Sequence, residues 1–135
     1  MKITIPGKPI AKRRPRFVRR GKFVGTYNDQ QTEEGQWILD AKPQVTEKME
    51  GPLVLNCLFI MPIPKGTSKK QMTVMLETPR PHDKKPDLDN LIKFVKDCLN
   101  ELAWRDDSQI AQIGAMKVYG ENPMTEIFIR GWKPD

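Results

Sequence analysis

Apolar residues recur along the chain at spacings that predict both helices and strands. Leu91, Val95 and Cys98 recur at helical intervals, and with their neighbours they predict an amphipathic helix over residues 88–102. Residues 52–61 instead form a nearly continuous apolar run of strand length, which is typical of a strand buried at the centre of a sheet. The spacing therefore predicts one amphipathic helix and one central strand.

The N-terminal part of the chain predicts a short strand and a hairpin. Residues 2–6 alternate between polar and apolar side chains and lead into a break rich in Gly and Pro, as a short strand does. Residues 16–18 and 22–24 flank Arg19-Arg20-Gly21. This arrangement predicts a hairpin in which Gly21 supplies the positive φ of the turn.

Two more helices are expected from local signals. The first is expected to begin after Asn28 or Asp29 as its N-cap and to end or kink at Pro43. The second is a short helix over residues 68–77. Residues 78–86 are rich in Pro and charge, so they predict a loop that leads into the helix at 88–102.

The last two expected strands lie in residues 110–119 and 125–132. The turn at residues 120–123 joins them, and we expect them to form an antiparallel pair. The chain has 135 residues, no internal repeat and no linker-like stretch, so residues 1–135 are expected to form one domain. The predicted fold is α/β (α+β), a single mixed sheet on which two main helices pack.

Positive charge is concentrated at the start of the chain. The formal net charge is +6, and no acidic residue precedes Asp29. The basic residues expected to contact a polyanion are Lys8, Lys12, Arg13, Arg14, Arg16, Arg19 and Arg20, together with Lys84 and Lys85 farther along. Such a segment neutralises phosphates and releases their condensed counterions, which favours a nucleic-acid partner. A basic loop that is merely solvated is the alternative.

Other motifs narrow the function by their absence from the sequence. A Gly-rich phosphate loop and a Gly-x-Ser-x-Gly nucleophile elbow are both missing, which argues against a nucleotide cofactor and against acyl transfer. No apolar run approaches the roughly 20 residues that cross a bilayer, so we expect a cytoplasmic protein without a membrane partner. Cys57 and Cys98 lack the spacing of a zinc site and are expected to be buried thiols.

Two carboxylates stand where the loop becomes the helix, at Asp87 and Asp89. Cleavage of a phosphodiester needs divalent cations, and Mg²⁺ prefers hard carboxylate oxygens. Capping of the helix by Asp87, with Asp89 near its positive end, explains the same pattern without a metal. Lys93 shares a helical face with Asp89, where it can pair with that acid or stabilise charge on a phosphate.

The sequence around these acids resembles the RusA family of Holliday junction resolvases. The resemblance lies in Asp87-Leu88-Asp89-Asn90-Leu91-Ile92-Lys93 and in Trp104-Arg105-Asp106-Asp107-Ser108-Gln109-Ile110, which match in order, spacing and residue type. The stretches Ile5-Pro6-Gly7-Lys8-Pro9 and Arg13-Arg14-Pro15-Arg16-Phe17 are also similar to the start of family members. The resemblance is thus spread over most of the chain.

The resemblance implies a metal-dependent endonuclease that cuts branched DNA. Asp87, Asp89 and Asp107 would be the ligands of Mg²⁺ or Mn²⁺, Lys93 would be the catalytic lysine, and Asp106 is an alternate third ligand. It further implies a homodimer that makes paired nicks in a four-way junction, in a bacterial or phage-encoded protein. A non-catalytic nucleic-acid-binding protein and a flap or single-strand nuclease are the rival functions.

The length of the expected helix raises a geometric difficulty. A helix over residues 88–102 would separate Asp87 from the helix end by roughly 20 Å. Asp107 then reaches the acidic pair only if the helix is shorter and the chain doubles back, or if Asp107 completes the site of a second subunit.

The tryptophans and the histidine are not expected to take part in catalysis. Trp37 and Trp104 are expected to pack in the core, and His82 is expected to be exposed to solvent.

Overall fold

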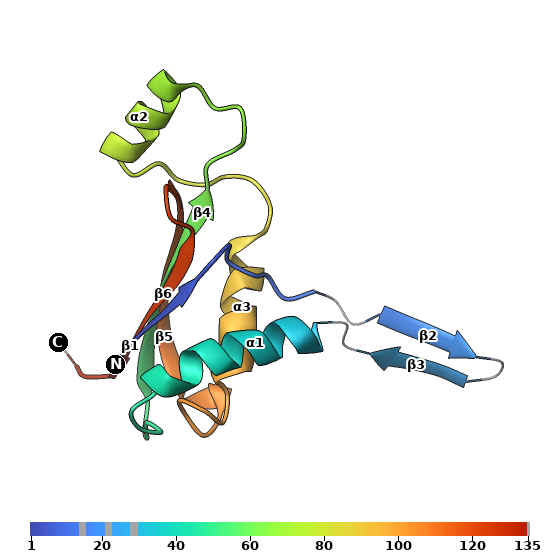
Figure 1. The fold of residues 1–135 in the computed structure, drawn as a ribbon. Coiled ribbons are helices and arrows are strands. Elements are labelled where there is room, and N and C mark those ends of the chain that lie inside the picture. Colours follow the sequence, from blue (N-terminus) through green and yellow to red (C-terminus); the bar gives the residue numbers. More distant parts are fainter. Residues whose placement is uncertain (14–15, 21–22, 28–29, 135) are drawn as a thin grey trace.

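A four-stranded mixed sheet, in the order β1-β6-β4-β5, forms the centre of the molecule (Figure 1). The computed structural model describes the backbone of residues 1–13, 16–20, 23–27 and 30–134, and the side chains of residues 1–13 and 30–134. The strands are β1 (Lys2–Pro6), β4 (Leu53–Pro62), β5 (Ile110–Gly120) and β6 (Met124–Gly131). The expected mixed sheet is therefore confirmed.

Helices cover one face of this sheet. They are α1 (Gln31–Ala41) and α3 (Leu88–Leu99), while α2 (Lys69–Glu77) lies beyond the end of β4 (Figure 1). Short 3₁₀ turns follow at η1 (Lys42–Gln44), where the first helix ends as Pro43 predicts, and at η2 (Asp107–Gln109). Ser68 caps α2 by accepting a hydrogen bond from the backbone of Gln71. Within the described ranges, none of the helices has the length and apolar character needed to cross a bilayer.

The core lies between the sheet and the two covering helices. Phe59 of β4 and Ile127 of β6 belong to the same buried cluster as Trp37 of α1 and Phe94 of α3. The two aromatic rings meet edge to face, with centroids 6.1 Å apart. Trp104 is fully buried in this cluster, so core packing of both tryptophans is confirmed. The two cysteines are free and buried, as expected.

The expected pairing of the last two strands is wrong. β4 lies between β5 and β6, pairing in parallel with β5 and antiparallel with β6. The physical reason is that β4 carries apolar residues on both faces and is best buried with a partner on each edge. The chain between β4 and β5, which includes α2 and α3, provides the long crossover that a parallel pair requires.

The helix expected over residues 88–102 begins as predicted but ends early, at Leu99. Asn100 has an extended backbone, with ψ of 133°. Glu101 then takes a positive φ of 68°, which reverses the chain. Trp104 forms isolated β-bridges with Asn100 and Met49, so the segment after the helix turns back along the molecule.

The basic hairpin is a separate two-stranded sheet that projects from the body (Figure 1). It consists of β2 (Arg16–Arg20) and β3 (Phe23–Tyr27), paired antiparallel. The turn expected at Gly21 and the N-cap expected at Asn28 or Asp29 lie outside the described residues. Gln30 occupies the N-cap position of α1, and its side chain makes no capping hydrogen bond.

Candidate active site

The exposed face of α3 brings acidic and basic side chains together with a segment that follows the helix. Asp89, Lys93, Lys96 and Asp97 recur at helical intervals on the side away from the core. They line an open pocket of about 500 Å³, and Asp107 lines the same pocket. One chain therefore places Asp89, Lys93 and Asp107 around a common hollow.

Asp107 reaches this pocket because α3 ends early and the chain doubles back. Its Oδ1 accepts a hydrogen bond of 2.8 Å from the indole Nε1 of Trp104. The Trp104 ring is wholly buried, so the donor has a fixed position. A core tryptophan therefore orients one oxygen of Asp107, and among the described residues no hydrogen-bond donor engages its Oδ2.

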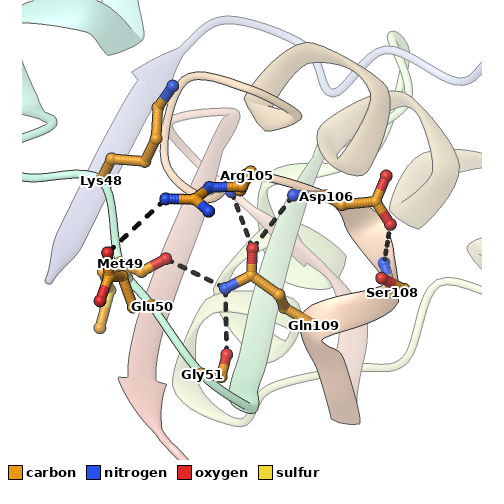
Figure 2. Close-up of a pocket in the computed structure, with 8 residues that line it drawn as sticks. All are labelled: Lys48, Met49, Glu50, Gly51, Arg105, Asp106, Ser108 and Gln109. Carbon is orange, nitrogen blue, oxygen red and sulfur yellow. Dashed lines mark hydrogen bonds and ion pairs between the residues drawn. The ribbon is translucent and has the colours of Figure 1, made fainter.

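The turn that carries Asp107 is held by Gln109 (Figure 2). The Gln109 Oε1 accepts hydrogen bonds from the backbone N–H groups of Arg105 at 2.8 Å and Asp106 at 3.0 Å. Its Nε2 donates to the backbone carbonyls of Met49 at 3.1 Å and Gly51 at 3.0 Å. This one amide thus ties the 105–109 turn to the chain that enters β4.

Asp106 faces a different pocket from Asp107. It lines the hollow drawn in Figure 2, and its Oδ2 accepts a hydrogen bond of 2.9 Å from the backbone of Ser108. Hydrogen bonds from Ser108 lower the pKa of the Asp106 carboxyl below its ordinary value. Asp106 therefore serves as the cap of η2, and the geometry favours Asp107 over Asp106 as a partner of Asp89.

Asp87 stands at the N-cap position of α3 without capping it. Its backbone is extended, and its exposed side chain makes no capping hydrogen bond. Capping is thus not what its carboxylate does. The described lining of the pocket that holds Asp89 and Asp107 does not include Asp87.

The donor atoms of this pocket suit a divalent cation held largely by water. Among the described residues, no three His, Cys, Asp or Glu side chains are grouped closely enough to share one ion. Mg²⁺ usually keeps several waters and is bound through one or two carboxylates together with substrate phosphates. Asp89 and Asp107 are two carboxylates that line the same pocket, together with Lys93 and Lys96.

Two cations of the basic segment are already engaged within the protein. The Lys12 Nζ lies 2.8 Å from Glu34 and 3.2 Å from Asp97, and its backbone N–H donates to the carbonyl of Asn90 at 2.9 Å. Burial alone lowers the pKa of Lys12, but hydrogen bonds and charge from both acids outweigh it and raise the pKa. Arg13 pairs with Glu33 at 2.9 Å.

These contacts fix the base of the hairpin beside α3. The buried Gln30 adds to them, since its Oε1 accepts from the Arg13 backbone at 2.6 Å and its Nε2 donates to the Ala11 carbonyl at 2.8 Å. Arg16, Arg19 and Arg20 belong to β2, and Arg14 lies outside the described residues. The exposed cations of the predicted set with described side chains are Lys8, Arg13, Lys84 and Lys85. A role of this set in DNA binding stays a prediction.

The expectation of a solvated His82 is wrong. Its side chain is buried against Tyr119, with ring centroids 4.9 Å apart, because the loop packs along the edge of β5. Burial, followed by the charge of Lys117, lowers the pKa of the imidazole.

Sequence reasoning also missed three supporting residues: Trp104 as a donor, Gln109 and Lys117. For Gln109 a signal existed, since Asp106-x-x-Gln109 matches a capping box. For Lys117 the signal was a lone charge inside a strand that is otherwise uncharged. Nothing in the sequence pairs the Trp104 indole with Asp107.

Comparison with known proteins adds two findings. The family model described as endodeoxyribonuclease RusA matches residues 6–130. A relative from Bacillus subtilis (strain 168), named uncharacterized protein YqaN, is 34% identical over 136 residues, covering 96% of this chain and 95% of the relative. Both matches span nearly the whole chain.

Proposed function

Because the chain belongs to the RusA endodeoxyribonuclease family, a family of divalent-metal-dependent Holliday junction endonucleases, we propose that it resolves four-way junctions by paired nicks in opposing strands. The observation that carries the proposal is the gathering of Asp89, Lys93 and Asp107 around one hollow of a single chain. A non-catalytic DNA-binding protein has no need of this arrangement.

The proposed mechanism assigns a task to each acidic and basic side chain of the site. Asp89 and Asp107 would hold Mg²⁺ or Mn²⁺, and Asp87, at the N-cap position of the same helix, would be a third ligand. Such an ion would supply a lowered pKa of the attacking water and neutralisation of the scissile phosphate. Lys93, one helical turn after Asp89, stabilises the negative charge that develops on the phosphate or on the leaving oxygen.

The basic segment is proposed to hold the arms of the junction. Phosphate contacts fix the position and orientation of a protein on DNA without reading its sequence, which suits a protein that recognises shape. The chain that leads into the β2–β3 hairpin is anchored beside α3 through Lys12, whose ammonium contacts Asp97 and whose backbone donates to the carbonyl of Asn90. A homodimer would present two such pockets, as paired nicks in a two-fold symmetric substrate require.

A cleavage assay on a labelled four-way junction tests the proposal. With Mg²⁺ the wild-type protein is expected to give paired nicks, whereas Asp89→Asn and Asp107→Asn are expected to bind the junction without cutting it. Asp40→Asn, on α1, is the matched control and should cut at the wild-type rate.

Three outcomes would contradict the proposal. A shifted band without cleavage at any metal concentration would indicate a binding protein. Preferential cutting of flap or single-stranded substrates would indicate a different nuclease. Wild-type rates for both site variants would remove the acidic pocket from the chemistry.

A further inference from the structure

Lys117 is a charged residue on the inward side of an edge strand. It lies in β5 opposite Phe59 of β4 and is half-buried. The backbone around it also holds the loop that precedes α3: the N–H of His82 donates to the Lys117 carbonyl at 3.0 Å, and the N–H of Tyr119 donates to the carbonyl of Arg80 at 3.0 Å. Residues 80–82 therefore lie along the outer edge of β5.

The Lys117 ammonium extends this contact toward the candidate active site. Its Nζ donates to the backbone carbonyl of Lys84 at 2.5 Å and to that of Pro86 at 2.7 Å. Pro86 directly precedes Asp87, which begins α3. Both carbonyls belong to a loop without regular structure, so the lysine satisfies acceptors that no neighbouring strand serves.

The position of Asp87 depends on its backbone, since its side chain makes no capping bond. On the helical side, the carbonyl of Asp87 accepts from the N–H of Leu91 at 3.2 Å. On the loop side, the nearest described constraint is the bond between Lys117 and Pro86. Lys117 thus ties the residue before Asp87 to the sheet, while α3, which carries Asp89, is anchored in the core.

We propose that Lys117 is a positioning residue that sets the place of the Asp87 carboxylate relative to Asp89 and Asp107. It acts through the backbone of residues 84–86 and touches neither the ion nor the DNA. The inference rests on the proposed function, because Asp87 matters only if this site binds a divalent ion. Residues that do not bind the metal but orient its ligands through hydrogen bonds typically change the metal affinity by about 10- to 100-fold when they are substituted.

The test compares Lys117→Met with wild type and with Lys65→Met, an exposed lysine in the turn before α2. Binding of Mn²⁺ is measured by calorimetry in the absence of DNA, and the Mg²⁺ concentration for half-maximal cleavage is measured separately. Junction affinity in EDTA and the thermal midpoint are recorded for each protein. Lys117→Gln, which keeps one amide donor for a carbonyl, is added in case the methionine variant folds poorly.

Lys117→Met is expected to weaken Mn²⁺ binding about tenfold and to raise the half-maximal Mg²⁺ concentration to a similar degree. Lys117→Gln should show a smaller change of the same sign, and Lys65→Met none. Junction affinity in EDTA should stay within about twofold of wild type, since the phosphate contacts are unchanged.

A purely structural role would lower the folded fraction without moving the metal affinity of the folded protein. Unchanged Mn²⁺ affinity in both Lys117 variants therefore overturns the inference. Failure of the wild-type protein to bind Mn²⁺ or to cut a junction instead overturns the proposed function, so the two failures are distinguishable.

Discussion

Replacement of Trp104 by Phe removes one defined interaction from the candidate active site. The indole Nε1 donates to the Asp107 Oδ1 at 2.8 Å, and a phenyl ring has no donor. The ring itself is fully buried, so the variant also loses packing. Both losses lower stability, whereas only the loss of the hydrogen bond acts on the carboxylate of Asp107.

The stability cost can be worked from these two terms. A hydrogen bond to a charged group contributes about 1.5–3 kcal/mol, and the half-buried Asp107 recovers part of it from water, so we take about 1.5 kcal/mol. Loss of the smaller ring of the indole adds about 1 kcal/mol through the cavity that it leaves. The sum of about 2.5 kcal/mol corresponds to a thermal midpoint lower by roughly 10 °C for a chain of this size.

Trp37→Phe is the matched control, because it makes the same substitution in the same core. Trp37 is buried, and the described residues provide no hydrogen-bond partner for its indole. We expect both variants to lower the thermal midpoint, with Trp104→Phe lowering it further. Only Trp104→Phe should weaken Mn²⁺ binding, by about tenfold, because Asp107 then loses its orientation.

Calorimetric titration of Mn²⁺ and scanning calorimetry measure these two quantities on the same samples. Unchanged Mn²⁺ affinity in Trp104→Phe would refute the reasoning, since it would mean that the indole bond contributes nothing to the placement of Asp107 as a proposed metal ligand. An equal loss of affinity in both would attribute the effect to core packing in general.

Three further predictions follow from the contacts of the site. Gln109→Ala should lower the free energy of unfolding by about 2–4 kcal/mol in urea, since it removes hydrogen bonds to four backbone groups. Gln112 is exposed, so Gln112→Ala should change the free energy of unfolding by less than about 0.5 kcal/mol. The pKa of Lys12 is raised in the folded protein, so its ion pairs stabilise the fold fully below the ordinary pKa of 10.5 and are lost as the pH rises through the higher folded value. The difference in stability between wild type and Lys12→Met, measured by urea unfolding, should therefore close only at strongly alkaline pH. If the protein forms the proposed homodimer, mixed dimers of Asp89→Asn and Asp107→Asn chains should show no regained junction cleavage, because Asp89 and Asp107 line one pocket of a single chain; regained cleavage would show a site shared between subunits.

The parts of the fold that local patterns determine were predictable from the sequence. The apolar run of β4 and the helical stripe of α3 each bury a face that is visible in the order of residues, and both elements are confirmed. The face of α3 that carries Asp89 and Lys93 follows from the same period. The family resemblance, stated on the motifs around these residues, is confirmed by the match over residues 6–130.

Pairing and long-range contacts were not predictable in the same way. The turn at 120–123 correctly separates two strands, but only the competition of all strands for the apolar β4 decides that β5 and β6 lie on opposite sides of it. The burial of His82 has the same origin, because it depends on the loop meeting the edge of β5. The residue pattern within one segment does not determine which other strand or loop that segment packs against.

The end of α3 connects the fold to the proposed chemistry. Had the helix continued to residue 102, as its apolar stripe indicates, Asp107 would lie far from Asp89. The chain leaves the helix at Asn100, and Glu101 with its positive φ reverses it, so that Trp104 enters the core and presents its indole to Asp107. Leu102 still packs against the core, which explains why the stripe runs past the true helix end. The acidic pocket is therefore created by the reversal after α3, and the burial of Trp104 holds that reversal in place.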